Sequence, residues 1–129
     1  MKIKVLIVDD ETLARNRIKQ LMAQETDLEL VGECDSGAQA LDFIREHRPN
    51  LVFLDVMMPK RNGFDVCHAV KKELGLSHIH IILLTAKGQE FDRLRGQEVG
   101  ADQYMTKPFD PDALVAHART VLGLSASGV

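Results

Sequence analysis

Carboxylates follow two of the most apolar runs in the sequence. Asp9 and Asp10 come directly after residues 5–8, and Asp55 comes directly after residues 51–54. Such runs are typical of strands that are covered on both faces of a parallel sheet. Carboxylates about 4 Å apart repel each other by roughly 1 kcal/mol in water and by up to ~4 kcal/mol at an intermediate dielectric. If the three acids lie close together, a bound cation would offset this repulsion, and Mg²⁺ prefers oxygen ligands of this kind.

Two further polar side chains stand at the ends of later runs. Thr85 follows residues 79–84, and Lys107 ends the segment that begins at Asp102. The long side chain of lysine can bring its charge back across two strand spacings, roughly 10 Å. Taken one at a time, these residues could be a satisfied strand-end hydroxyl and a solvated edge lysine, and Asp10 could be a helix cap. Together with the acids they provide a nucleophile, cation ligands, a donor and a counter-charge for phosphoryl transfer to aspartate.

The strands and helices that must position these residues are predicted from the pattern of apolar residues, which alternates between two types along the chain. Five runs rich in Val and Ile are each followed by a stretch with the 3.6-residue period of an amphipathic helix. The expected strands lie within residues 3–10, 28–35, 51–55, 79–86 and 102–108, and the expected helices within 11–24, 36–48, 63–74, 89–100 and 110–123. Five βα units in succession predict an α/β fold with a parallel sheet and helices on both faces.

The composition of the strands predicts their order. The first, third and fourth are almost continuously apolar, as strands in the middle of a sheet should be. The second carries Glu29 and Glu33, and the fifth carries Gln103, Tyr104 and Thr106, so both resemble edge strands. We therefore expect a flavodoxin-like, doubly wound, five-stranded parallel sheet of order 2-1-3-4-5 rather than 3-2-1-4-5. In that order strands 1 and 3 are neighbours about 4.8 Å apart, with the binding crevice at their carboxyl ends.

Length and composition describe one globular domain. The chain has 129 residues, 45% of them hydrophobic, and a net charge of −3, which offers no basic excess for direct binding of nucleic acid. No apolar run approaches the ~20 residues of a membrane span, and we expect a cytoplasmic protein. Cys34 and Cys67 fit no ligand or redox spacing and are expected to be reduced thiols. We expect the domain to occupy residues 1–124, with 125–129 as a short flexible tail.

The motifs at the strand ends resemble those of response-regulator receiver domains of two-component signalling. The likeness covers residues 4–122 and rests on "LIVDDE", "LDVMMPKRNGF", "LLTA" and "GADQYMTKPF" in this order. It implies that Asp55 is phosphorylated. It further implies that Mg²⁺ is ligated by Asp10, Asp55 and the backbone carbonyl of Met57, while Asp9 holds the metal through water.

The resemblance also implies how such a site would switch. Lys107 would pair with the phosphoryl group, Thr85 would swing in to hydrogen-bond it, and Tyr104 would rotate inward into the vacated space. The peptide bond between Lys107 and Pro108 would be cis. The output surface would be the helix within 89–100, the fifth strand and the last helix. That fourth helix contains Gly96 and has only three anchoring side chains: Phe91, Leu94 and Val99.

The same resemblance gives expectations for the partners of the chain and for the lifetime of its phosphorylated state. A sensor histidine kinase or histidine phosphotransfer protein would phosphorylate the chain, contacting Leu13, Ala14 and Ile18 on the first helix. Separate substrate turnover is not expected, and the chain would be a monomer or a phosphorylation-dependent dimer with an unspecified downstream target. Met57 and Lys87 carry no carboxylate or amide to orient an attacking water, so we expect a moderately long-lived phosphoaspartate.

Two other classes share parts of this pattern. A flavin-binding module has the same fold but needs a phosphate-cradling loop of small residues after strand 1, where this chain has "DDET". A phosphatase with an aspartyl-phosphate intermediate needs an acid two residues beyond the nucleophile, where this chain has Met57. Both alternatives are therefore disfavoured by the residues at those positions.

Overall fold

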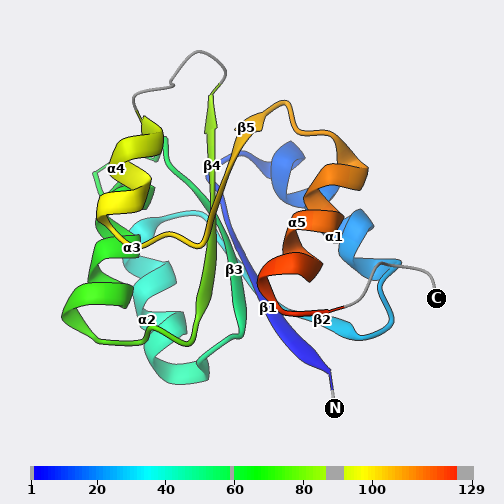
Figure 1. The fold of residues 1–129 in the computed structure, drawn as a ribbon, viewed down its shortest axis with the longest axis horizontal. Helices are drawn as coiled ribbons and strands as arrows, with labels where there is room; N and C mark the ends of the chain where they lie inside the picture. The colour runs from blue at the N-terminus through cyan, green and yellow to red at the C-terminus, as the bar shows by residue number, and fades with distance from the viewer. Residues whose placement is uncertain (1, 59, 87–91, 125–129) are drawn as a thin grey trace.

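The computed structural model describes residues 2–58, 60–86 and 92–124. A five-stranded parallel sheet lies between two layers of helices (Figure 1). In chain order the elements are β1 (Ile3–Val8), α1 (Thr12–Ala23), β2 (Leu28–Cys34), α2 (Gly37–His47), β3 (Leu51–Asp55), α3 (Gly63–His68), the π-helical segment η1 (Ala69–Glu73), β4 (His80–Ala86), α4 (Asp92–Glu98), β5 (Gln103–Lys107) and α5 (Pro111–Val121). In the described residues, every helix is too short or too polar to cross a membrane.

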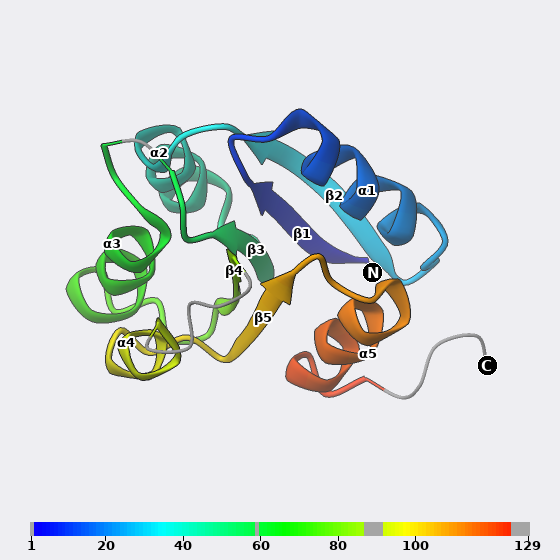
Figure 2. The ribbon, with the colours of Figure 1, turned by 90° about the horizontal axis from the view of Figure 1, so that it is seen from above.

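The strand order is β2-β1-β3-β4-β5, as the strand compositions predicted. β2 and β5 are the edges, and all neighbouring strands pair in parallel. Viewed from above, α1 and α5 cover one face of the sheet, while α2, α3 and α4 cover the other (Figure 2). The topology reverses between β1 and β3, so the crevice of this fold lies at the carboxyl ends of those two strands.

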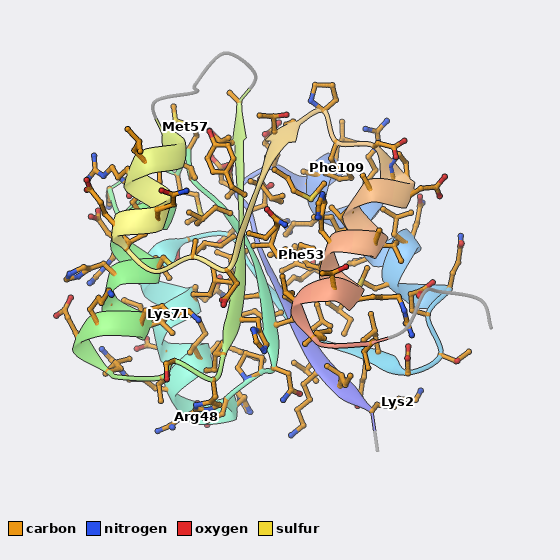
Figure 3. All side chains as sticks on the ribbon, in the orientation of Figure 1. Lys2, Arg48, Phe53, Met57, Lys71 and Phe109 are labelled. Carbon is orange, nitrogen blue, oxygen red and sulfur yellow. The ribbon has the colours of Figure 1, made fainter. Side chains whose placement is uncertain are left out.

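Each central strand contributes to two hydrophobic cores. In β3, Val52 and Leu54 face the core under α2 and α3, while Leu51 and Phe53 face the core under α1 and α5. All four are fully buried, and Figure 3 labels Phe53 among the side chains on the α5 side of the sheet. Burying one large aliphatic or aromatic side chain contributes about 1.5–3 kcal/mol. This burial on both faces explains why the central strands are apolar without alternation.

Local signals at the helix ends agree with the predicted boundaries. The Asp110 carboxylate accepts a hydrogen bond from the backbone N–H of Ala113 at 3.0 Å, and Pro111 occupies the first turn of α5. Gly100 and Gly123 follow α4 and α5 with φ of +89° and +72°, a conformation that favours glycine. These caps satisfy helix-end groups that would otherwise lack partners.

Three details differ from the prediction. Residues 69–73 form a π-helical turn, in which the N–H of Leu74 donates to the carbonyl of Ala69 at 2.8 Å, rather than a continuation of α3. β4 begins at His80, one residue later than expected, and ends at Ala86 as predicted, where it pairs with Lys107 of β5. Leu94 does not anchor α4, since it is 67% exposed. Phe91, the other proposed anchor, and the predicted tail at 125–129 lie outside the described residues.

α4 packs close to the sheet at Gly96. A Cβ at this position would lie 3.2 Å from Leu83 Cδ1 and 3.7 Å from Tyr104 Cδ2. The missing side chain therefore allows the helix to approach β4 and β5, which compensates for the roughly 1 kcal/mol that glycine costs within a helix.

Both cysteines are free and buried. Burial raises the pKa of the Cys34 thiol to about 11 and that of the Cys67 thiol to about 12, so both stay protonated at neutral pH. This agrees with the expectation of unreactive, reduced thiols.

Candidate functional site

Three carboxylates converge at the carboxyl ends of β1 and β3. Asp9, Asp10 and Asp55 each offer an oxygen, and these oxygens lie within 4.8 Å of one another. The reason is the pairing of Val8 with Leu54, the residues that precede Asp9 and Asp55. Asp9 and Asp55 are 0% and 2% exposed, whereas Asp10 is exposed. The juxtaposition predicted from the strand order is thus present in the structure.

Backbone groups orient the two buried acids. The N–H of Glu11 donates to Asp9 Oδ1 at 2.9 Å, and the N–H of Met57 donates to Asp55 Oδ1 at 3.3 Å. The loop after β3 then folds back, and Gly63 N–H donates to the carbonyl of Val56 at 3.0 Å. A Cβ on Gly63 would overlap the backbone of Asp55, so only glycine permits this close return.

Lys107 brings the opposite charge into the cluster from β5. Its Nζ lies 2.7 Å from Asp9 Oδ2, 3.2 Å from Glu11 Oε1 and 3.5 Å from Asp55 Oδ1. The peptide bond between Lys107 and Pro108 is cis, as the resemblance implied. The long side chain therefore crosses from the edge of the sheet to its centre, as expected from the strand spacing.

The electrostatics of the cluster leave an excess of negative charge. Burial, and next the charge of Asp9, raise the pKa of Asp55 to about 7, although Lys107 and the Met57 N–H act in the opposite direction. Burial alone would lower the pKa of Lys107, but its bond to Asp9 and the charge of Asp55 raise it overall. In the part of the chain that the structure describes, the single ammonium of Lys107 thus faces several acids. An all-oxygen donor set with uncompensated charge fits a hard cation such as Mg²⁺.

Thr85 and Tyr104 lie on one face of the sheet. Thr85 is fully buried and follows Leu84, which pairs with Asp55. Tyr104 pairs with Leu83 on the next strand and packs against the core beneath α2 and α3. Because side chains alternate along a strand, Leu83 and Thr85 face the same side, the side that α4 covers. Thr85 therefore lies near the end of the strand next to that of Asp55, on the side of the sheet that carries Tyr104.

An open groove of ≈ 780 Å³ borders the cluster. Its lining residues come from α1 and the residue before it, from the last residues of β3, β4 and β5, and from the loops after β3 and β5: Glu11, Leu13, Ala14, Asn16, Arg17, Gln20, Asp55, Met57, Ala86, Lys107, Pro108 and Phe109. Leu13 and Met57 are 81% and 60% exposed. Figure 3 labels Met57 at the end of the molecule toward which the strands run. Ile18 is fully buried in the core, so its predicted place on a contact surface was wrong.

The sequence reasoning did not single out Glu11. Its carboxylate accepts a hydrogen bond from the Lys107 ammonium, although 96 residues separate the two in the chain. Glu11 is the third acid of "DDE", and this was the only sign of it in the sequence. An acid that follows a strand is common, and it carries no information about a distant lysine. Lys87, which we connected with the lifetime of the phosphorylated state, lies outside the described residues.

Known proteins resemble this chain both in sequence and in fold. Residues 5–119 match the response regulator receiver domain family. The chain is 44% identical over 125 residues to the probable transcriptional regulator ycf27 of Porphyra purpurea, a match that covers 94% of this chain and 48% of that protein. It is 42% identical over 123 residues to the DNA-binding response regulator MtrA of Mycolicibacterium smegmatis, covering 95% and 51%. The chain spans about half the length of these curated relatives.

Solved structures show the same architecture. A putative response regulator from Chloroflexus aurantiacus matches with a TM-score of 0.87 at 29% identity, covering 95% of this chain and 99% of that one. The BeF3-activated receiver domain of DrrB matches with a TM-score of 0.82 at 30% identity, covering 95% and 99%. These matches give no support to the flavin-binding and phosphatase alternatives. The chain belongs to the response regulator receiver domain family and is a phospho-accepting signalling switch.

Proposed function

We propose that Asp55 is the phosphoacceptor of this switch. The observation that carries the proposal is the convergence of three carboxylates, with Asp55 nearly buried and yet lining an open groove. The same convergence supports a Mg²⁺ site formed by Asp10, Asp55 and the backbone carbonyl of Met57, with Asp9 acting through water. When bound, Mg²⁺ would neutralise negative charge on the phosphoryl group and on the attacking carboxylate.

The reaction proposed for Asp55 transfers a phosphoryl group from a phosphodonor to a carboxylate oxygen. A carboxylate oxygen of Asp55 forms a bond to phosphorus, and the bond from phosphorus to the donor breaks. With phosphohistidine, the P–N bond electrons stay on the imidazole, which takes up a proton; with an acyl phosphate, a carboxylate leaves. The attacking group must be ionised, and the nearby ammonium of Lys107 favours that form. Lys107 then serves as counter-charge to the transferred group, whose oxygens it pairs with.

The switch would act through Thr85 and Tyr104. Phosphorylation adds about −1.5 to −2 charges and three acceptor oxygens beside Asp55. The Thr85 hydroxyl would turn toward these oxygens, and Tyr104 would move inward on the same face of the sheet. Gly96 lies against Tyr104, so this motion would shift α4. The proposed output surface is therefore α4, β5 and α5.

The groove supports a docking site for the phosphodonor protein. Leu13 and Met57 offer exposed apolar surface in the groove that Asp55 lines, and the groove reaches Pro108. A sensor histidine kinase or histidine phosphotransfer protein would dock beside α1. We place this exchange in the cytoplasm.

The downstream partner and oligomeric state belong to the same proposal. The two relatives described above are named as a probable transcriptional regulator and a DNA-binding response regulator, and this chain spans about half of their length. The net charge of −3 offers no basic excess, so DNA would not be bound by this chain itself. The chain itself would be a monomer or a phosphorylation-dependent dimer, without separate substrate turnover. Met57, which carries no group able to orient water, supports a moderately long-lived phosphoaspartate.

Mass spectrometry after incubation with acetyl phosphate tests the proposal. With Mg²⁺, the protein should gain about 80 Da, the mass of one phosphoryl group, and fragmentation should place it on Asp55. The Asp55→Asn variant and wild-type protein in excess EDTA should gain nothing. A phosphoryl group on another residue, or equal uptake by the variant, would refute the assignment.

A further inference from the structure

Among the described residues, Lys107 has three carboxylate partners, and they differ in exposure. Asp9 and Asp55 are buried parts of the proposed phosphorylation site, whereas the Glu11 side chain is 66% exposed at the edge of the groove. The Glu11 oxygen lies 3.2 Å from the ammonium. Glu11 is the only one of the three that has no part in the proposed metal and phosphoryl chemistry.

We propose that Glu11 is a positioning residue that holds Lys107 in the unphosphorylated state and competes with an incoming phosphoryl group for it. The inference rests on the proposed phosphorylation of Asp55 and adds the control of that step. To pair with a phosphoryl group, the ammonium has to exchange carboxylate partners for phosphate oxygens. Glu11 opposes this exchange and lies where a donor must enter.

The exposure of Glu11 makes the contact reversible. An ion pair in contact with solvent is weak, because water screens both charges and the side chains lose rotamer freedom. Asp9, by contrast, lies fully buried and accepts the shorter bond, at 2.7 Å. We therefore expect Glu11 to release Lys107 first, so that its carboxylate acts as a gate and Asp9 as the fixed support.

The negative charge of Glu11 also affects which donors react easily. Small phosphodonors such as acetyl phosphate carry negative charge and have to pass Glu11 to reach Asp55. Like charges repel over this short distance, and dissolved salt screens the repulsion at exposed positions. A docked donor protein covers the groove and can offer its own groups to Glu11, so it is less sensitive to this charge. Glu11 would thus reduce non-specific phosphorylation by small anions.

The variant Glu11→Gln tests this gate, since it removes the charge and keeps the shape. We expect phosphorylation by acetyl phosphate at low salt to be about 3- to 10-fold faster than in wild type, and the gain to fall below about 2-fold in 0.5 M salt. The matched control is Glu29→Gln, which removes an exposed charge from β2 near the opposite end of the strands. It should leave the rate unchanged.

Two readouts without phosphorylation complete the test. In Glu11→Gln the Lys107 side-chain ¹⁵N resonance should shift, and the Mg²⁺ dissociation constant from calorimetry should change by less than about 2-fold, because Glu11 is not a proposed ligand. Equal rates for the Glu11 variant, the Glu29 variant and wild type would overturn the inference, as would a rate gain that salt leaves unchanged. If wild-type protein takes up no phosphoryl group on Asp55, the proposed function itself fails.

Discussion

The ammonium of Lys107, at the end of β5, lies 2.7 Å from the fully buried carboxylate of Asp9, at the end of β1. The two residues are 98 positions apart in the chain. Their bond brings a positive charge into the cluster of acids formed by Asp9, Asp10 and Asp55. Most of the expected effects of mutation and of pH on this site follow from that one compensating charge.

Replacing Asp55 with asparagine should stabilise the metal-free protein more as the pH rises. Its pKa is raised from 3.8 to about 7, so the folded state holds a proton that the unfolded state releases. Ionised Asp55 therefore costs stability, increasingly from pH 4 up to pH 8. By urea unfolding in EDTA, Asp55→Asn should be about 2–4 kcal/mol more stable at pH 8 and nearly equal to wild type at pH 4.

The exposed Glu46→Gln variant of α2 is the control for loss of one negative charge, and it should show no such trend. Adding Mg²⁺ should reduce the advantage of Asp55→Asn at pH 8, because the cation stabilises only the wild-type site by binding the folded state. A stability difference that is constant between pH 4 and pH 8 would contradict the explanation.

Replacing Lys107 with methionine should destabilise the protein at neutral pH. The change keeps most of the apolar side chain but leaves buried Asp9 without the ammonium at 2.7 Å. Removing one partner of a buried ion pair typically costs about 3–5 kcal/mol, and we expect ~2–4 kcal/mol because Asp55 can take up a proton instead. Chemical denaturation at pH 7.5 measures the loss.

Acid conditions separate this effect from poorer packing. Below about pH 5 the carboxyl of Asp55, whose pKa is raised to about 7, is protonated, so there is less negative charge for Lys107 to compensate and the Lys107→Met deficit should shrink. Exposed Lys2→Met is the matched control and should be neutral at both pH values. An undiminished deficit at pH 4.5 would point to packing as the cause.

Replacing Gly63 with alanine should disrupt the loop that follows the acceptor strand. The added Cβ would overlap the backbone of Asp55, which cannot move aside as a flexible side chain could. We expect a loss of about 2–4 kcal/mol in unfolding free energy and at least a tenfold slower phosphorylation by acetyl phosphate. Gly75→Ala is the control for the backbone strain that alanine causes at a positive φ, since φ of Gly75 is +66° and an added Cβ would meet nothing within 4 Å. It should cost stability but leave the phosphorylation rate per folded molecule unchanged.

Thr85→Ala should separate phosphorylation from switching. Thr85 lies on the face of the sheet that carries Tyr104, and it is the hydroxyl proposed to reach the phosphoryl group. Mass spectrometry should still show a phosphoryl group on Asp55, because the carboxylates and Lys107 are untouched. The amide chemical-shift changes on α4 and β5 that accompany phosphorylation in wild type should fall by at least about half. Thr85→Ser, which retains the hydroxyl, should restore them; full-sized changes in the alanine variant would exclude Thr85 from the switch.

The sequence by itself determined the layout of the molecule. The periodicity of the apolar residues predicted the positions of the strands and helices. Glu29 and Gln103 identified the edge strands, because strands in the middle of a parallel sheet are covered on both faces and are therefore apolar. With the order known, Asp9 and Asp55 had to meet, since both directly follow neighbouring parallel strands. These inferences use only local patterns and the fixed geometry of a sheet.

Only the tertiary structure decided which partners the long side chains choose. Glu11 contacts Lys107, Ile18 points into the core, and Leu94 points to solvent, although each lies in an element that was predicted correctly. The helical periodicity of a sequence defines the apolar face of a helix only to within about one residue. It gives no information about contacts between segments about a hundred positions apart. Those contacts depend on how closely the elements pack, as at Gly96, where the absence of a side chain sets the distance between α4 and the sheet.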